Sequence, residues 1–584
     1  MQKRSNPKPQ GVSSHAMLVL LAALLGWLYT VAPVTQLADS RYTLLASHAA
    51  LHHQTLLLDA YELPQGPYQL DVVNGHTVSH YPPGTPLLTV PLLAWRESLG
   101  ESVLGPSGRY APWLEERVQH SIAAILTAVT VLLIGLLART WLPLPWTLGV
   151  MVVVGLGSPL LSTASRALWS HTWGVLVLTL LLLHLRRLGL GRPVSPVLLG
   201  SLGALLYLIR PSFSLAVAAT GLYLLDHVRR TTPRPWHLLV FQPLPLRFGL
   251  TVLAWLAPFW LWSYSIWGHP LPAYYRHPLG NPAFLQALAG NLASPQRGLL
   301  LYCAWLVPVG VLLTRYRATL PQPRLVVMAL GYALVHWVLI SANPMWTGGG
   351  SYGPRLLTDL VPIFALLLIV ALAAWRTARA TQPPQPWMPT ALGVSTLLAL
   401  ALHVDGAWNT ETWRWHTWPH PESEFARMWN WERAEFLAGL WQPIAPYQPG
   451  TRLAFTEQGG VQPYLLRGWA NPEAGATWTM AQEASIQLAL PRVAQARTLT
   501  LEMAPFLGRP PQPQQVAVAV NGVHVGDLVV AKRDRYSLPV PADVAMESDW
   551  RIDLHLARPQ RPDEAGLGTD NRLLGLSVLA LEIR

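Results

Sequence analysis

Asp39-Ser40-Arg41-Tyr42 opens a polar stretch that ends at His80-Tyr81-Pro82-Pro83-Gly84, and apolar runs flank this stretch on both sides. The stretch contains four carboxylates and five histidines. The apolar run before it, residues 17–35, ends only a few residues before Asp39. A carboxylate where a first membrane helix meets water is unfavourable unless it has a partner or a chemical task. We therefore expect this stretch to be a functional loop at the surface of a membrane protein.

The composition is that of a membrane protein. Of the 584 residues, 51% are hydrophobic and 12% are charged, whereas soluble domains carry about 25% charged residues. The net charge of +11 does not indicate nucleic-acid binding, because the basic residues lie in short clusters between apolar runs. The single cysteine, Cys303, excludes a disulfide within the chain.

Eleven apolar runs predict membrane-spanning helices. They cover residues 17–35, 120–138, 146–164, 172–185, 196–209, 212–225, 248–267, 299–314, 325–341, 356–375 and 389–403. A further run, 85–95, decides the topology. If it lies at the membrane surface, 16 Lys and Arg residues fall on the side of the N-terminus and nine on the other side. The positive-inside rule therefore predicts a multi-pass protein of the inner (plasma) membrane with a cytoplasmic N-terminus and an extracytoplasmic C-terminal domain.

With this topology, every unusual polar loop lies on the outer face. These loops are the stretch from Asp39, Ser165–His171, Ile209-Arg210-Pro211, Ser294–Gly298 and Trp346–Arg355. Arginines gathered at one membrane face suit an anionic headgroup such as a lipid phosphate. The plainer interpretation of any one of them is a snorkelling or ion-paired side chain.

The C-terminal part has a different pattern. Residues 406–449 are rich in Trp and predict an interfacial region with a helix over about 422–440. Beyond residue 450, short runs with strand character predict a β-sandwich: 498–503, 516–520, 523–525, 551–556 and 576–583. Asn521-Gly522 lies between two of these runs and predicts a hairpin turn.

These patterns divide the chain into four predicted regions. They are a cytoplasmic N-terminus (1–16), a transmembrane part (17–405) with an outer loop at 36–119, the interfacial region (406–449) and an extracytoplasmic β-sandwich domain (450–584).

Asp39-Ser40-Arg41-Tyr42 closely follows the first apolar run, and residues 74–87 contain Tyr81-Pro82-Pro83-Gly84. The first motif is similar to the start of the first outer loop, and the second to a stretch with Tyr-Pro-Pro-Gly, in the GT-C superfamily. The resemblance is in particular to bacterial glycosyltransferases of the protein O-mannosyltransferase and aminoarabinose-transferase type. Further resemblances lie at 294–299 and 349–355 and, for an all-β domain appended to some members, at 468–473, Trp478 and 570–576.

The resemblance implies a polytopic α-helical membrane protein of about eleven transmembrane helices with a C-terminal β-sandwich. It also implies an enzyme that transfers a sugar from a polyprenyl-phosphate donor to an extracytoplasmic lipid, glycan or protein. One departure concerns a second acidic residue that relatives often carry in a later outer loop. The matching region here, Leu168-Trp169-Ser170-His171, contains no acid, so a two-carboxylate mechanism is not supported.

Such a transfer needs a base for the acceptor hydroxyl and cations for the phosphate that leaves. Asp39 is the predicted base, although Asp at this place also suits a helix N-cap. The predicted substrate-binding residues are Arg41, Tyr42, His80, Tyr81, Arg166, His171, Arg297, Tyr352 and Arg355.

No cofactor is predicted, and no metal ligands are assigned. His48 and His52 have the helical i, i+4 spacing of a metal pair, but the residues between them are Ala49-Ala50-Leu51, with no Glu. A divalent metal is thus compatible with the sequence but not supported by it.

Two alternatives of another class stay open. One is a transporter or flippase of a lipid-linked glycan, which predicts ionisable residues at mid-membrane and inverted repeats. The other is a non-catalytic assembly protein for envelope polysaccharide, in which the β-domain binds the partner.

Overall fold

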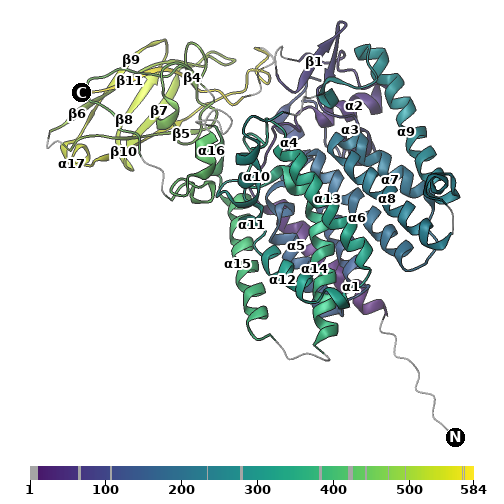
Figure 1. Cartoon of the computed structure of the whole chain (residues 1–584). Helices are drawn as coiled ribbons and strands as arrows, with labels where there is room; N and C mark the ends of the chain where they lie inside the picture. The colour runs from purple at the N-terminus through teal and green to yellow at the C-terminus, as the bar shows by residue number, and fades with distance from the viewer. Residues whose placement is uncertain are drawn as a thin grey trace. The chain divides into compact units, whose positions relative to one another are not determined.

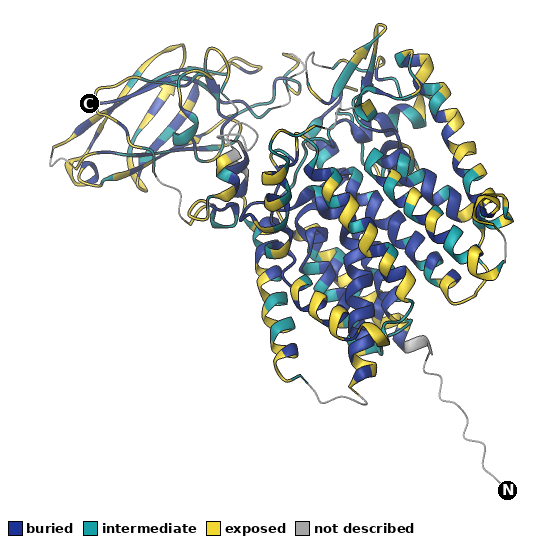
Figure 2. Cartoon of the chain, in the orientation of Figure 1, coloured by how far each residue is buried: buried dark blue, intermediate teal, exposed yellow. Residues whose placement is uncertain are grey.

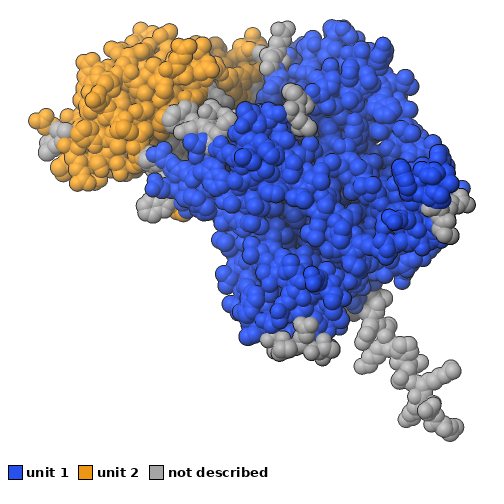
Figure 3. All heavy atoms as spheres, viewed as in Figure 1, with its two compact units in different colours: residues 1–103, 112–438 blue, residues 104–111, 439–584 orange. Residues whose placement is uncertain are grey.

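The structure is a computed structural model that describes the chain apart from a few short stretches. Those stretches are residues 1–10, 64–66, 106–107, 233–234, 277–279, 380–384, 418–424, 441–443, 471, 493–494, 568–569 and 571. Asn471 and Asn571, which belong to two of the resembling motifs, therefore lie outside the described residues. The chain forms two compact units, residues 1–103 with 112–438 and residues 104–111 with 439–584 (Figure 3).

The first unit is helical (Figure 1). Its helices are α1 (Gly11–Val31), α2 (Thr43–His52), α3 (Gly84–Ser98), α4 (Pro112–Ala138), α5 (Leu144–Leu156), α6 (Ser170–Gly189), α7 (Pro196–Ile209), α8 (Ser214–Thr231), α9 (Pro243–Trp267), α10 (Phe284–Ala293), α11 (Leu299–Tyr302), α12 (Leu306–Arg315), α13 (Pro323–Ser341), α14 (Val361–Ala378), α15 (Trp387–Trp408) and α16 (Thr412–Thr417). Each of the eleven predicted spans overlaps a helix of the structure, and α11 and α12 share the run predicted at 299–314.

Length and apolar character separate the helices that can cross a membrane. Among the described residues, seven helical segments qualify: Ser14–Val31, Leu114–Ala138, Ser170–Gly189, Pro243–Trp267, Pro323–Ser341, Arg355–Ala378 and Trp387–Trp408. Four shorter helices, α5, α7, α10 and α12, are apolar as well. The last 18 residues of the most apolar segment form α14, which is buried along almost its whole length (Figure 2), as expected for a helix that is hydrophobic on all sides. The predicted polytopic helical fold is confirmed.

The polar stretch after α1 folds into α2, a hairpin and the start of α3. The hairpin pairs β1 (Leu70–Val73) with β2 (His76–Ser79) in antiparallel register. Asn74 and Gly75 both have positive φ, 52° and 83°, as a tight two-residue turn requires. Gly84, at the start of α3, lies so close to the end of α7 that a Cβ would be 2.5 Å from the Leu208 carbonyl carbon. The stretch therefore rests directly on the helical unit.

The second unit is the predicted β-sandwich. Its strands are β3 (Leu453–Ala454), β4 (Thr477–Trp478), β5 (Glu483–Ala489), β6 (Arg497–Pro505), β7 (Gln514–Val520), β8 (Val523–Val530), β9 (Asp534–Val540), β10 (Asp549–Leu556) and β11 (Leu576–Ile583), with a short helix α17 (Ala542–Ala545). In the described part of the chain, one sheet has the order β5-β10-β7-β8 and the other β3-β11-β6-β9, with β4 beside β11.

Alternating burial along the strands builds the core of this unit. Every second residue of β7 is buried, from Gln514 to Val520, and the inward side chains of both sheets meet around Trp550 and Leu501. Asn521 and Gly522 have φ of 52° and 79° and join β7 to β8, so the predicted hairpin turn is confirmed.

The helix predicted over 422–440 is wrong for the residues that the structure describes. Residues 422–424 lie outside them, and the remainder forms two short 3-10 turns, Phe425–Trp429 and Glu435–Leu437. The backbone carbonyls of Arg427, Asn430 and Arg433 accept hydrogen bonds from the Gln296 side chain. These carbonyls thus accept hydrogen bonds from a distant loop. The described part of this segment forms 3-10 turns and no α-helical turn.

Candidate functional site

Asp39 lies on the loop between α1 and α2, against the 3-10 turn Arg355–Leu360 that precedes α14. The Arg355 guanidinium donates to Asp39 Oδ2 at 2.7 Å, although the two residues are 316 positions apart. The side chain of Asp39 remains 28% exposed, whereas that of Arg355 is 10% exposed. The fold thus joins the predicted base to a predicted phosphate contact, with the carboxylate still accessible.

Two tyrosines complete the surroundings of the Asp39 carboxylate. The Tyr68 hydroxyl donates to Asp39 Oδ1 at 3.1 Å, and the Tyr81 hydroxyl also hydrogen-bonds the carboxylate. Burial raises the pKa of Asp39, but the Arg355 guanidinium and the two hydroxyls outweigh burial, and the pKa is lowered overall. Asp39 is therefore ionised at neutral pH and can accept a hydrogen bond from a further hydroxyl.

Two guanidinium groups around the Tyr68 hydroxyl have unused donors. In the described residues, the Nε atoms of Arg41 and Arg355 are buried and have no hydrogen-bond partner. Both guanidinium groups interact electrostatically with the Tyr68 hydroxyl, and the Arg355 guanidinium stacks 4.3 Å from the centre of the Trp169 ring. Buried N–H groups without a partner are rare, and here they suit an anionic ligand.

The helix-cap interpretation of Asp39 is wrong. Helix α2 begins at Thr43 after Tyr42, which has a left-handed φ of 69°, and no side chain of its own caps it. Glu115 of α4 instead accepts from the backbone N–H of Tyr42 at 3.0 Å and from that of Leu44 at 2.7 Å. Because Glu115 satisfies these N–H groups, the Asp39 carboxylate does not cap α2.

His80 and Tyr81 belong to an aromatic group next to Asp39. The His80 ring meets the rings of Tyr81 and Tyr274 edge-on, at 5.5 and 5.6 Å between centres, and the Asp71 carboxylate accepts a hydrogen bond from His80 Nδ1 at 3.1 Å. The rings of Tyr81 and Tyr274 are 5.4 Å apart. Tyr274, in the 3-10 turn Ala273–Arg276 after α9, was not identified from the sequence.

His171 lies in a buried polar cluster with a carboxylate that the sequence analysis did not assign. His171 Nδ1 is 2.7 Å from Asp359 Oδ1, and Arg210 Nη1 is 2.7 Å from His171 Nε2. Asp359 and Arg355 belong to the same 3-10 turn. The carboxylate beside His171 therefore comes from another segment, the turn that also carries Arg355.

The Arg166 guanidinium binds backbone carbonyls. It is buried and donates to the carbonyls of Tyr29, Ala32 and Val34 at 2.5, 3.0 and 3.4 Å. These carbonyls lie at the C-terminal end of α1 and just beyond it. Arg166 thus holds the end of α1.

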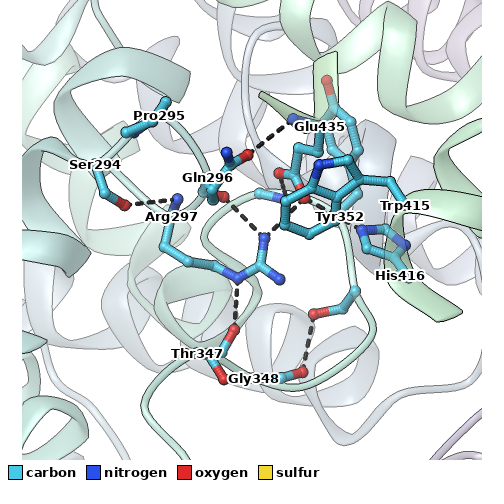
Figure 4. Close-up of polar contacts among 12 residues, drawn as sticks. Ser294, Pro295, Gln296, Arg297, Thr347, Gly348, Tyr352, Trp415, His416 and Glu435 are labelled. Carbon is cyan, nitrogen blue, oxygen red and sulfur yellow. Dashed lines mark hydrogen bonds and ion pairs between the residues drawn. The ribbon is translucent and has the colours of Figure 1, made fainter. Parts of the chain in front are cut away.

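Arg297 lies in a second buried cluster, centred on Glu435 (Figure 4). Its guanidinium donates to Glu435 Oε2 at 2.8 Å and to the carbonyls of Thr347 and Gly349 at 2.5 and 3.1 Å. Glu435 also accepts from the Tyr302 hydroxyl and the Gly353 N–H, both at 2.6 Å. Arg297 therefore joins the glycine loop at 347–349 to the segment after α16.

Burial and pairing shift the pKa of Glu435 in opposite directions. Burial raises the pKa of the carboxyl, but Arg297, His416 and Tyr302 outweigh burial and the pKa is lowered. Tyr352 packs against this cluster and donates to the Leu402 carbonyl at 2.8 Å and to Asp405 at 3.0 Å. Arg297, Tyr352 and Glu435 thus form an internal support.

Fold and geometry define a polytopic helical membrane protein with a C-terminal β-sandwich and a partly exposed acid–arginine pair. No protein-family model matches the chain, and no curated protein matches it in sequence.

Three solved structures with a similar course of the chain are the following. The archaeal oligosaccharyltransferase AglB from Archaeoglobus fulgidus, in complex with an inhibitory peptide and a dolichol-phosphate, is 13% identical over 74% of this chain and 61% of that chain, with a TM-score of 0.40. The arabinosyltransferase EmbB from Mycobacterium smegmatis is 12% identical over 100% of this chain and 66% of that chain, with a TM-score of 0.41. ArnT from Cupriavidus metallidurans, bound to undecaprenyl phosphate, is 14% identical over 68% of this chain and 71% of that chain, with a TM-score of 0.37.

The chain spans 61% of the length of the archaeal oligosaccharyltransferase. With identities of 12–14% and TM-scores near 0.4, the similarity does not define the reaction of this chain, which is argued below from its own residues.

Proposed function

We propose that this chain is a membrane glycosyltransferase that moves a sugar from a polyprenyl-phosphate donor to an extracytoplasmic acceptor. The observation that carries the proposal is the pair of Asp39 and Arg355, with the carboxylate partly exposed and a guanidinium donor buried without a partner. The motifs at 39–42 and 74–87 support the same activity.

Asp39 acts as the general base. The acceptor hydroxyl attacks the anomeric carbon of the sugar, and its proton passes to the Asp39 carboxylate. The lowered pKa keeps this carboxylate ionised before the reaction, and the Tyr68 and Tyr81 hydroxyls fix its orientation. A positioned base of this kind contributes about 10²–10⁴-fold to the rate.

Arg355 and Arg41 hold the lipid phosphate. As the bond from the anomeric carbon to the phosphate oxygen breaks, the electron pair goes to that oxygen, and the polyprenyl phosphate leaves with one more negative charge. Fixed cations next to an oxygen that gains charge stabilise the transition state. The buried Nε donors of Arg41 and Arg355 face no protein acceptor in the described residues and are available for this task.

The remaining predicted residues take two different roles. His80 and Tyr81 lie beside Asp39 and orient the acceptor or donor. Arg166, Arg297 and Tyr352 donate hydrogen bonds to protein acceptors and position the surrounding loops. His171, paired with Asp359, supports the turn that carries Arg355.

The acceptor is a lipid, a glycan or a protein outside the cytoplasm. This follows from the predicted topology, in which the N-terminus lies in the cytoplasm of the inner (plasma) membrane and the Asp39 loop on the outer face.

The test compares Asp39→Asn with wild type in a membrane preparation that lacks endogenous glycan. Transfer of label is followed from a panel of polyprenyl-phosphate sugars, and thermal unfolding first shows that both proteins fold equally. Asp59→Asn is the matched control, because Asp59 lies on the same loop but pairs with His76. We expect a loss of about 100-fold or more for Asp39→Asn and little change for Asp59→Asn.

Equal transfer by wild type and Asp39→Asn would refute the role of Asp39 as base. Absence of transfer from every donor, by a wild type that is folded, would refute the enzyme and favour an assembly protein or flippase.

A further inference from the structure

Two histidines and a glutamate meet where α2 and α3 pack together. His48 and His52 lie one turn apart on α2, and Glu97 lies in the last turn of α3. One ligand atom from each of the three side chains lies within 4.8 Å of the other two. In particular, His52 Nε2 is 2.8 Å from Glu97 Oε2, and His48 Nε2 is 3.8 Å from Glu97 Oε1. The sequence contains no acid between the histidines, but the fold supplies one from another helix.

These separations are close to those of a coordinated metal. Zinc binds imidazole nitrogen at about 2.0–2.1 Å and carboxylate oxygen at about 2.0–2.2 Å, so tetrahedral ligand atoms are about 3.4 Å apart. The two observed separations, 2.8 and 3.8 Å, lie on either side of that value. Small side-chain rotations would therefore place an ion between the three groups.

The surroundings of the two inner ligands also point to an ion. Glu97 Oε1 is buried and has no hydrogen-bond partner in the described part of the chain, which is unfavourable for a carboxylate oxygen. His48 Nδ1 is 2.7 Å from the Tyr61 hydroxyl, so the opposite nitrogen, Nε2, faces Glu97. A hydrogen bond to the far nitrogen is how proteins orient a metal-binding histidine.

We propose that His48, His52 and Glu97 bind a divalent transition-metal ion such as Zn²⁺, which links α2 to α3. Two imidazoles and a carboxylate leave a fourth tetrahedral position for water. The competing explanation is a plain ion pair between His52 and Glu97. The site shares no residue with the Asp39–Arg355 pair and stands without the proposed transferase activity.

The test measures metal bound to the full chain in detergent. The protein carries an affinity tag without histidine, is stripped with a chelator and is titrated with Zn²⁺, with bound metal determined by elemental analysis and calorimetry. We expect about one tight equivalent in wild type, loss of this equivalent in Glu97→Gln and in His48→Gln/His52→Gln, and no tight binding of Mg²⁺, which prefers oxygen ligands.

Two further variants make the result specific. His53→Gln is the matched control, because His53 adjoins His52 but is not one of the three grouped ligands, and it should retain the equivalent. Tyr61→Phe removes the hydroxyl beside His48 Nδ1 and should weaken binding by about 10-fold or more. Zn²⁺ should also raise the unfolding temperature of wild type but not of Glu97→Gln. No tight equivalent in wild type, or an equal one in folded Glu97→Gln, would overturn the site and leave the ion pair.

Discussion

Replacing Glu435 by Gln tests whether the buried cluster around Arg297 supports the helical unit. The carboxylate of Glu435 is fully buried and faces donors from Gly353, Tyr302, Arg297 and His416. The substitution keeps the shape of the side chain but leaves the Arg297 guanidinium, which is 1% exposed, without a counter-charge. Breaking one partner of a buried ion pair costs about 3–5 kcal/mol.

The expected shift in unfolding temperature follows from the size of the unit. With an unfolding entropy of about 2 cal/mol/K per residue, a unit of about 400 residues loses about 3–6 °C for this change. The assay is thermal unfolding of the full chain in detergent, followed by tryptophan fluorescence.

Glu432→Gln is the control for this experiment, since Glu432 is exposed and only three residues away. We expect it to change the unfolding temperature by less than about 1 °C. The double variant Arg297→Met/Glu435→Gln should recover part of the loss, because no unpaired cation remains. An unfolding temperature of Glu435→Gln equal to that of Glu432→Gln would refute the reasoning.

Two further predictions concern Asp39 and Glu115. The pKa of Asp39 is lowered in the folded chain, so its contribution to stability is complete above the unfolded pKa of about 3.9 and is lost only as the pH falls through the lower folded pKa. The rate of sugar transfer should therefore show no loss due to Asp39 between pH 5 and pH 8. A loss of rate on acidification above pH 5 that is absent from the residual rate of Asp39→Asn would contradict this prediction. Glu115→Ala leaves the N–H groups of Tyr42 and Leu44 without their acceptor, which costs about 1–3 kcal/mol and should increase proteolytic cleavage around α2, whereas unchanged cleavage would show that α2 does not depend on Glu115.

Local patterns predicted much of the fold. The apolar runs identified the helices of the first unit, and the alternating strands with Asn521-Gly522 identified the sandwich of the second. Such patterns depend on neighbours a few residues away, so they are readable without the fold. The helix over 422–440 was predicted from a region rich in Trp, whereas backbone carbonyls of this segment accept hydrogen bonds from the distant Gln296 side chain.

The partners of the candidate residues could not be predicted in the same way. Asp39 and Arg355 were both singled out by their motifs, but their pairing spans 316 positions. Nothing in the sequence distinguishes four further acids, Glu97, Glu115, Asp359 and Glu435. The partner of each one belongs to a helix or loop that is distant in the chain. Isolated carboxylates in an apolar sequence are the signal that would have found them, because a buried acid needs a partner.

The contacts of Arg166 bear on how the protein is made. The carbonyls of Tyr29, Ala32 and Val34 lie at the end of α1, and the guanidinium that binds them follows more than 130 residues later in the chain. Until then these carbonyls must bind water or lipid headgroups, since an unpaired carbonyl is unfavourable within the bilayer. During synthesis the end of α1 therefore lacks these hydrogen bonds until the segment between α5 and α6, which carries Arg166, has been made.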